Sequence, residues 1–546
     1  MTGLKQALLA ALNSLLRGRS FLQALFAFWV SPATIKEHHV KTELPRRSTE
    51  DFLGEARQRL LGPIEGDKLQ RLSQDLKIQF RERLQHHAES MLPSFNHLLP
   101  TGQEKGQYVA LDVGGSTLRV ALVALSGREV SGKESEIVRM QSFKITPEIK
   151  GLEGMDFFDW MATRIHEVIM ADGAETHDTA SPILMGLAWS FPVEQTSVGG
   201  GLLLGMGKGL LATNGLLGQD LGEILQLACK KQGLNVELAA IVNDGTATLL
   251  SQAYVHAETR FGLILGTGVN IAVHLPVSAF HRSKFGKRPD SWFESASHVI
   301  VNTELGMYGH GILPITRWDE LLNDAHPRPE FQPLEHLLSG YYLGEIVRLA
   351  LVEAIESTGL LGGEIPSSLE KPYSLDTETL SRIEADSTPE FDVALPYFAA
   401  THPSPVAPTP TDLATIRTLA AYATRRSAAL LAACVFGLWE LRHETEAEYL
   451  NSQVPPNKAP TPRKASFVAE ARAETTLPQT KVAFNGSVIE RYPGYLANCQ
   501  AYIDSLVSDS EHVGAIKLVP ALESSILGAA VALACAGEQK EQILQV

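Results

Sequence analysis

The chain has 546 residues, of which 44% are hydrophobic, and its formal net charge is −15. This length and apolar content predict a large core divided over two or more domains, whereas the acidic balance argues against nucleic acid as a partner of the bulk surface. Four cysteines show no metal-like spacing, so we expect reduced core thiols in an intracellular protein: Cys229, Cys434, Cys499 and Cys535.

Residues 1–36 carry four cations and no acidic residue. Leucines recur at helical spacing from Leu8 to Leu16, and an apolar run from Phe21 to Val30 follows. This run is too short to span a bilayer, which needs about 20 residues. We expect reversible attachment to a membrane surface, namely the outer face of mitochondria, with the remaining chain in the cytosol. A secretory signal stays open, although Ser31-Pro32 is a poor cleavage site, and so does a helix packed on the protein's own core.

Strand-like and helix-like runs alternate from Tyr108 onward, after a charged helical region at residues 51–90. This alternation predicts an α/β fold with at least partly parallel sheets. Two stretches rich in Pro, Ser and Thr, at about 386–412 and 445–474, are expected to be surface loops. A strand, a turn and a helix are expected again from Lys481, before a last strand leads into an apolar helix.

Two glycine turns between apolar strands are the most informative motifs of the chain, and they indicate phosphate binding. They lie in VALDVGGSTLRVALV (residues 109–123) and FGLILGTGVNIAVHL (residues 261–275). Each predicts a β-hairpin whose tip exposes backbone N–H groups, to which Ser or Thr adds a hydroxyl donor. One such turn is more often an ordinary tight turn, but two facing turns could hold a triphosphate. Asp112 opens the first turn, and a carboxylate beside a phosphate loop indicates an intervening metal ion.

Polar residues follow several predicted strands at their carboxyl ends, where α/β proteins usually place their sites. They are Ser190, the pair Asn243-Asp244, and the residues Asn302 and Glu304. Acidic and uncharged hydrogen-bonding groups that converge in this way are typical of a site for a polyhydroxylated ligand such as a sugar. Ordinary turn and capping chemistry is the alternative explanation for Asn and Asp at these places.

The motifs together resemble those of eukaryotic hexokinases, from about Glu55 to Ala536. The resemblance rests on LPTGQEKGQYVALDVGGSTLRVALV, SFPVEQTS, GKGL, IVNDGTATL, LGTGVNIA, VNTELGMYG and FQPLEHLLSGYYLGEIVR, which follow in the family's order. The last motif is closer to the fungal members. The resemblance implies a two-lobed, actin-like (ribonuclease-H-like) ATPase fold of the α/β class that closes over a sugar. Residues 50–242 would form the small lobe and residues 243–546 the large lobe, with insertions at the two Pro-rich stretches.

The resemblance also implies the site and its chemistry. It implies that Asp244 accepts the proton of the 6-hydroxyl of glucose or another hexose as that oxygen attacks the γ-phosphorus of MgATP, as in the first step of glycolysis. Lys208 would neutralise charge on the transferring phosphoryl group. The implied sugar site comprises Ser190, Lys208, Asn243, Asp244, Asn270, Glu304 and Glu335. The implied site for ATP and Mg²⁺ comprises Asp112, which would hold the metal through water, with Gly114, Gly115, Ser116, Thr117, Gly266, Thr267, Gly268, Gly486, Ser487 and Ser525.

Departures from the family pattern cluster on the nucleotide side. The first loop has Ser116-Thr117 where the family has Thr-Asn, and the family's Asp-Gly-Ser turn has Asn485 in place of Asp. Gly207 replaces the Thr before the lysine, and Gly245 and Ala247 replace Thr and Gly after the base. In the last loop the family's two glycines are Ser524 and Ile526, and we expect Ile526 to strain the backbone and to fill space near the nucleotide.

Two functions are therefore open from the sequence. The first is an ATP-dependent hexose kinase, which the retained Asp112 and Asp244 favour. The second is a non-catalytic, hexokinase-like sugar sensor or regulator with a degraded nucleotide site. The altered loops, the N-terminal segment and the long insertions favour this second reading.

Overall fold

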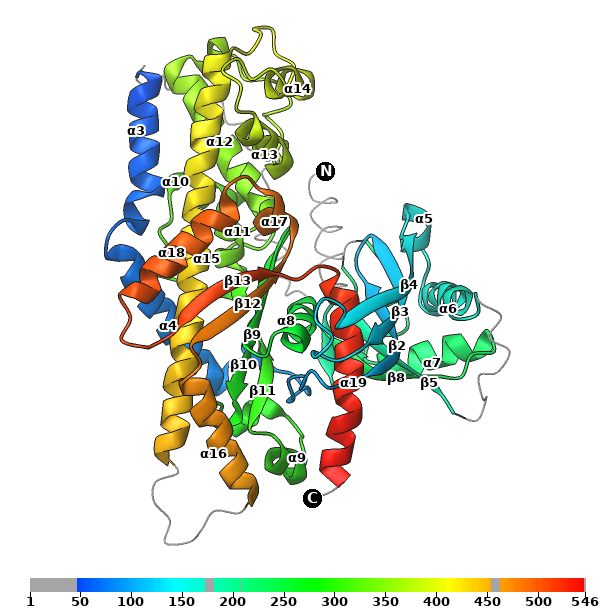
Figure 1. Cartoon of the computed structure of the whole chain (residues 1–546). Coiled ribbons are helices and arrows are strands. Elements are labelled where there is room, and N and C mark those ends of the chain that lie inside the picture. The colour runs from blue at the N-terminus through cyan, green and yellow to red at the C-terminus, as the bar shows by residue number, and fades with distance from the viewer. Residues whose placement is uncertain (1–46, 172–180, 208, 453–461, 545–546) are drawn as a thin grey trace, which may run out of the picture. The chain divides into compact units, whose positions relative to one another are not determined.

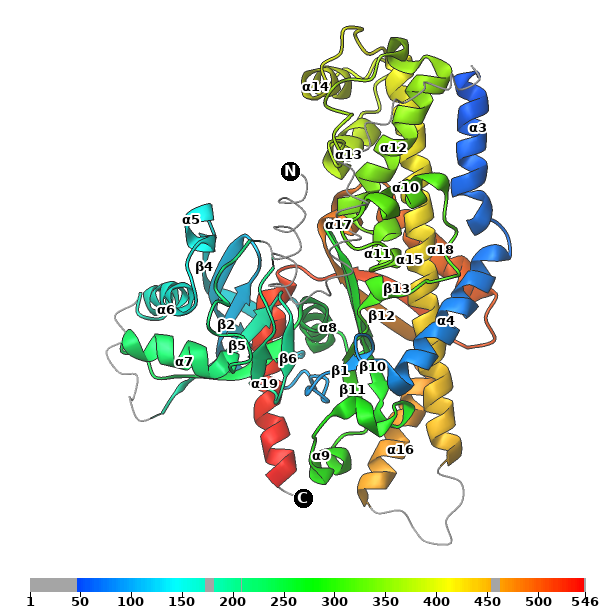
Figure 2. The ribbon, with the colours of Figure 1, turned by 180° about the vertical axis from the view of Figure 1, so that it is seen from behind.

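The computed structural model describes residues 47–544, apart from 172–180, 208 and 453–461. It separates Met1–Arg47 from a compact unit, Ser48–Val546, and only this second unit is described below (Figures 1 and 2). The N-terminal membrane prediction and Lys208 lie outside the described residues.

Three sheets form the framework of this unit. The six-stranded sheet has the order β1 (Leu92–Pro93), β11 (His298–Asn302), β10 (Val269–Pro276), β9 (Thr259–Leu265), β12 (Gln479–Asn485) and β13 (Ala515–Pro520). The five-stranded sheet has the order β4 (Ser135–Lys144), β3 (Thr117–Leu125), β2 (Gly106–Val113), β5 (Ile183–Trp189) and β8 (Val236–Val242). A short ribbon pairs β6 (Val193–Gln195) with β7 (Gly201–Leu203).

The two large sheets share one topology. Each begins with an antiparallel hairpin, β2–β3 or β9–β10, and adds two parallel strands beside the first strand of that hairpin, β5 and β8 or β12 and β13. Both glycine turns form the tips of these hairpins, as predicted. Because the first strands of both hairpins lead into turns that carry phosphate-loop candidates, the repeated topology gives the unit two such loops.

Helices connect and cover the strands. Those between Ser48 and β11 are α3 (Thr49–Leu60), α4 (Lys68–His86), α5 (Pro147–Lys150), α6 (Met155–Ile169), α7 (Leu221–Lys231), α8 (Asp244–Val255) and α9 (Asp290–Ser295). After β11 come α10 (Arg317–Ala325), α11 (Pro333–Leu338), α12 (Gly340–Thr358), α13 (Thr377–Ala385), α14 (Ala394–Thr401), α15 (Pro410–Ser452), α16 (Pro462–Thr475), α17 (Ser487–Arg491), α18 (Tyr495–Ser508) and α19 (Ser524–Leu544). Short 3-10 helices occur at η2 (Gly62–Ile64), η3 (Val277–Ala279), η4 (Arg282–Phe285), η5 (Leu305–Met307) and η6 (Leu360–Gly363).

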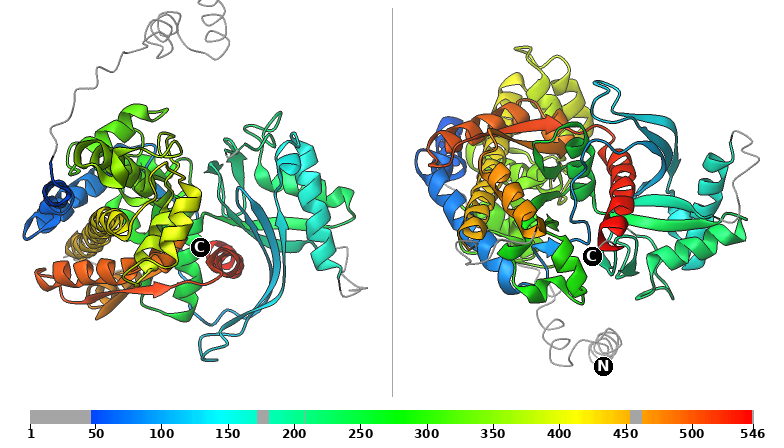
Figure 3. Two further views of the ribbon diagram at one scale, coloured as in Figure 1. Left: turned by 90° about the horizontal axis from the view of Figure 1, so that it is seen from above. Right: turned by 60° about the horizontal axis from the view of Figure 1, so that its bottom comes forward.

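Helices α8 and α19 pack against each other between the two large sheets. Helix α8 lies on the six-stranded sheet, and α19 lies against the five-stranded sheet, as Figure 3 shows with α19 in red. The crossing is close, because a Cβ added at Gly528 would lie 2.1 Å from the carbonyl oxygen of Ala247. Asp244 at the start of α8 and the last nucleotide loop at the start of α19 are therefore held by one packed helix pair.

The division between the lobes differs from the expected boundaries. Helices α3 and α4 pack along α15 (Figure 2), and β1 pairs with β11, so these N-terminal elements belong with the six-stranded sheet. Conversely, α19 contributes to the core of the five-stranded sheet although it ends the chain. The resemblance implies one lobe at 50–242 and the other at 243–546, but long-range packing assigns the first helices and the last helix to the opposite lobes.

The two Pro-rich stretches contain more helix than expected. Helix α14 and the start of α15 lie within 386–412, and the end of α15 and most of α16 lie within 445–474. Among the described residues, α15 alone is long and apolar enough to cross a membrane, but 83% of its apolar window is buried inside the protein. The four cysteines are buried and unpaired, which confirms their prediction as core thiols.

Candidate active site

Ser190 and Asp244 meet at the carboxyl ends of β5 and β8. The hydroxyl of Ser190 donates to Oδ1 of Asp244 at 2.9 Å. The Asn243 side chain caps α8 by accepting from the Thr246 amide at 2.7 Å, which places Asp244 in the first helical turn. Because all of these residues follow parallel strands at one sheet edge, strand order brings them together. Asp244 is partly exposed and can accept a proton.

A second cluster lies where β10 begins and the antiparallel strand β11 ends. The Asn270 side-chain amide donates to Oδ1 of Asn302 at 2.7 Å, and the Asn302 amide donates to Oε1 of Glu304 at 2.7 Å. Glu304 has a left-handed backbone, with φ 52° and ψ 56°. Burial raises the pKa of Glu304, although the hydrogen bond from Asn302 opposes this rise.

Glu335, in α11, joins this cluster from a different part of the chain. Its Oε2 accepts from the Val269 amide at 3.1 Å, beside the second glycine turn. Burial raises the pKa of Glu335, the Val269 amide opposes the rise, and the nearby charge of Glu304 adds to it. Two partly buried carboxylates therefore lie close enough to influence each other, at the end of the sheet that also carries Asn270.

Close packing of α8 on the six-stranded sheet connects the two clusters. A Cβ added at Gly245 would lie 3.2 Å from the backbone nitrogen of Ala272, two residues after Asn270. Asp244 is therefore adjacent to the strand that carries Asn270. Of the seven predicted sugar-site residues, six lie in this connected region, and the seventh, Lys208, is outside the described residues.

The predicted phosphate loops keep free backbone donors. In the first turn, Gly114 donates to Thr117, and the amides of Gly115 and Ser116 donate to none of the described residues. The second turn is closed by a bond from Gly266 to Gly268 and lies beside the start of α17, where a Cβ on Gly266 would be 3.5 Å from the Ser487 nitrogen. These glycine turns and the helix N-terminus resemble an anion cradle in their donor chemistry.

Gly486 separates β12 from α17 in a conformation that other residues rarely adopt. Its φ is 132°, and an added Cβ would lie 2.3 Å from the carbonyl oxygen of Leu265. The side chain of Asn485, which replaces the family's Asp, donates to the Ala521 carbonyl at 3.0 Å. That contact ties this turn to the strand end that leads into Ser525.

Arg119 links two acidic residues beside the first turn. Its Nε and Nη2 contact Oδ2 of Asp112 at 2.8 and 2.5 Å, and its Nη1 contacts Oε2 of Glu523 at 2.6 Å. Burial raises the pKa of Asp112, Arg119 opposes that rise, and the charges of Asp244 and Glu523 add to it. Sequence reasoning missed Arg119 and Glu523, because their partners are known only once β3 and α19 are placed.

Asp112 fits the role expected for Mg²⁺. Its Oδ1 accepts no hydrogen bond from the described residues and is therefore able to accept one from a metal-bound water. Within the described part of the chain, no three His, Cys, Asp or Glu side chains form a metal cluster. Mg²⁺ is commonly bound by one or two carboxylates together with substrate phosphates, so one carboxylate beside two phosphate loops is a suitable donor set.

The expectation for Ile526 is wrong. Its side chain is fully buried in the core that α19 forms with α8 and the five-stranded sheet, rather than beside the nucleotide loops. The left-handed backbone falls on Glu523, with φ 48°, and Ser524 and Ile526 belong to α19. The Ser524 hydroxyl lies 3.0 Å from that of Thr248. The two replaced glycines are therefore accommodated by helix packing.

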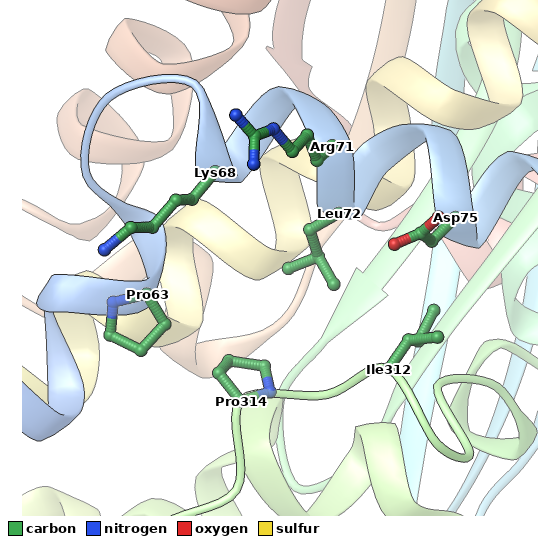
Figure 4. Close-up of a pocket in the computed structure, with 7 residues that line it drawn as sticks. All are labelled: Pro63, Lys68, Arg71, Leu72, Asp75, Ile312 and Pro314. Atoms are coloured by element: carbon green, nitrogen blue, oxygen red, sulfur yellow. The ribbon is translucent and has the colours of Figure 1, made fainter.

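Figure 4 shows a hollow of about 240 Å³ between η2, α4 and the loop after η5. None of the predicted site residues lines it. Its two cations are engaged, since Lys68 donates to the Gly62 carbonyl at 2.7 Å and Arg71 pairs with Asp67. This hollow is therefore separate from the clusters described above.

Comparison with known proteins relates this chain to one family. Two family models, both described as hexokinase, match residues 62–254 and 260–535. Hexokinase-5 of Oryza sativa is 34% identical over 306 residues, 56% of this chain and 58% of the relative. Hexokinase-1 of Saccharomyces cerevisiae is 33% identical over 299 residues, 54% of this chain and 60% of the relative. The chain thus spans about three fifths of the length of these curated relatives.

A solved hexokinase from Schistosoma mansoni, complexed with glucose, superposes with a TM-score of 0.68 at 25% identity. The match covers 90% of this chain and 100% of that structure. The fold is accordingly the two-lobed α/β sugar-kinase fold that the sequence predicted. The chain belongs to the hexokinase family.

Proposed function

We propose that this protein is an ATP-dependent hexokinase that phosphorylates the 6-hydroxyl of glucose or a similar hexose. The observation that carries the proposal is the Ser190–Asp244 hydrogen bond beside the Asn270–Asn302–Glu304 network. A potential base thus lies next to fixed donors and acceptors for sugar hydroxyls. Family membership supports the same activity.

The chain's own residues suggest how the reaction proceeds. Glu304 and Glu335 accept hydrogen bonds from sugar hydroxyls, and Asn270 donates one, so the hexose is held in one orientation. Asp244 accepts the proton of the hydroxyl that attacks, while Ser190 holds one of its carboxylate oxygens. This fixed geometry supplies positioning, on which phosphoryl transfer depends strongly.

The nucleotide side supports MgATP as the phosphoryl donor. Backbone amides at both glycine turns and at the start of α17 would bind phosphate oxygens, with Ser116 and Thr267 as further hydroxyl donors. Asp112 would hold Mg²⁺ through water, and the metal would neutralise charge on the phosphates. Lys208 keeps the role that the family resemblance implies.

Direct detection of the product tests this proposal. Purified full-length protein is incubated with glucose and MgATP, and phosphorus NMR identifies the phosphate ester formed. Glucose 6-phosphate is expected. Glucose binding without any phosphate ester would contradict the kinase and support the sugar-sensor alternative.

We also propose that residues 1–36 attach the protein to the outer face of mitochondria while the lobes lie in the cytosol. Support comes from the sequence alone, through four cations, no acidic residue and an apolar run. Cell fractionation would compare the full chain with a form that lacks these residues. Sedimentation of only the full chain with mitochondrial membranes is expected, and equal distribution of both forms would contradict the proposal.

A further inference from the structure

Asn302 occupies a fixed place between two strands. It is the last residue of β11, and its backbone lies opposite Ala272 on β10 and Leu92 on β1. Neighbouring strands on both sides therefore restrict its position. The side chain of such a residue can act as a rigid spacer between groups at the strand ends, in this case Asn270 and Glu304.

The chemistry of the partners fixes which way the Asn302 amide points. An ionised Glu304 can only accept hydrogen bonds, so the Asn302 nitrogen must face it, at 2.7 Å. The Asn302 oxygen then faces Asn270 and accepts from its side-chain nitrogen at 2.7 Å. The Asn270 oxygen in turn accepts from the Ile271 amide at 2.8 Å and from the Leu305 amide at 3.3 Å. Each bond therefore determines the orientation of the next group.

This network leaves specific atoms for a ligand. No described residue uses the second side-chain hydrogen of Asn270 or the Oε2 atom of Glu304 for a hydrogen bond. One is a donor and the other an acceptor, as a hexose with several hydroxyls requires. The orientation of both atoms depends on Asn302.

Asn302 also holds Glu304 in a strained backbone conformation. Glu304 has a positive φ of 52°, which is uncommon for a residue with a side chain. Its own amide approaches the Asn302 oxygen at 3.3 Å, while its carboxylate accepts from the Asn302 nitrogen. Asn302 thus holds both the backbone and the side chain of Glu304.

We propose that Asn302 is a positioning residue for the hexose, which orients Asn270 and keeps Glu304 turned toward the sugar as an acceptor. This inference rests on the proposed hexokinase function and adds a residue to it. Asn302 acts through its two neighbours and does not itself bind the reacting groups.

The charges around Glu304 make the proposal testable by pH. Glu335 on α11 and Tyr308 after η5 are the described titratable groups whose ionisation is coupled to that of Glu304. The bond from Asn302 favours the ionised carboxylate and so opposes the rise in the pKa of Glu304 that burial causes. Removal of this donor should raise the pKa of Glu304, so the loss of glucose affinity on acidification should begin at a higher pH.

The experiment measures glucose binding to the full chain by calorimetry over a pH series, without nucleotide. Asn302→Asp keeps the shape but removes the donor and adds a like charge, and Asn302→Ser is a second variant that retains a small polar group. Asn323→Asp is the matched control, because Asn323 donates to Glu330 at 2.9 Å on an exposed surface. Thermal unfolding without sugar verifies that each variant is folded.

Both Asn302 variants should bind glucose about tenfold more weakly or worse at neutral pH, with the acidic loss of affinity shifted to higher pH. The KM for MgATP should be unchanged in both, and Asn323→Asp should match the wild type. Folded variants with wild-type affinity and pH dependence would overturn the role of Asn302 alone. A wild-type protein that does not bind glucose would overturn the proposed function and this inference together.

Discussion

Ser190 donates a 2.9 Å hydrogen bond to Asp244, and this contact joins the end of β5 to the first turn of α8. The Ser190 amide also donates to the Val113 carbonyl at 3.2 Å, at the end of β2, where the first glycine turn begins. One serine therefore connects the proposed base with the strand that leads into the phosphate loop. The residue proposed to accept the proton and the loop proposed to bind phosphate are therefore linked through Ser190.

Replacing Ser190 by Ala should lower kcat/KM for glucose. The Asp244 carboxylate would lose one charged hydrogen bond, which is worth about 1–2 kcal/mol. This loss corresponds to a fall in kcat/KM of roughly 5- to 30-fold. Steady-state kinetics measures the change, and Ser508→Ala, an exposed serine that donates to the Ser505 carbonyl, serves as the control. Equal kinetics for Ser190→Ala and the control would show that this bond does not orient the base.

Glu304→Gln should weaken glucose binding and stabilise the sugar-free protein. The neutral amide is a poorer acceptor for sugar hydroxyls, so the free energy of glucose binding should become less favourable by about 1–3 kcal/mol. Burial raises the pKa of Glu304, so the folded state binds its proton more tightly than the unfolded chain does. An ionised Glu304 therefore costs folding free energy at neutral pH, and this cost disappears as the pH falls through the raised pKa.

Urea unfolding without sugar tests the stability half of that prediction. The variant should have a higher free energy of unfolding at neutral pH, and the difference should shrink on acidification. A variant that is less stable than the wild type at neutral pH would contradict the account of Glu304 as a strained acceptor kept for binding.

Ile526→Gly should destabilise the fold instead of improving ATP binding. The Ile526 side chain is completely buried in helix α19, so its removal leaves a cavity and places a glycine in a helix. The expected loss is about 3–6 kcal/mol of unfolding free energy. Leu522→Gly is the matched control, because Leu522 is 70% exposed just before that helix. A stable Ile526→Gly protein with tighter ATP binding would instead support the sequence-based prediction that Ile526 fills space near the nucleotide.

The sequence was sufficient for features that depend on local patterning. The glycine turns were predicted as hairpins because apolar strands flank them, and Asp244 and Glu304 were found because they follow recognisable strands. The family resemblance added Asn270 and Glu335, whose positions have no local signal of their own.

Features that depend on distant partners were missed or misread. Asn302 was noted at a strand end, but its role depends on Asn270, which is 32 residues away. The glycine pattern of the family predicts a positive φ at Ile526, whereas the structure has the positive φ at Glu523. The sequence predicts a loop where helix α16 forms, because Pro, Ser and Thr are frequent in the stretch that contains its start. In the structure it packs along α15, and its Glu474 pairs with Arg260 at 2.6 Å.

The most direct test of the hexokinase account compares the wild type with Asp244→Asn in a coupled assay of glucose 6-phosphate formation. The amide keeps the shape of the side chain but cannot accept the proton of the attacking hydroxyl. We predict a fall in kcat of about 10²- to 10⁴-fold, with glucose binding by calorimetry largely retained. An Asp244→Asn protein with wild-type turnover would contradict the assignment of Asp244 as the base.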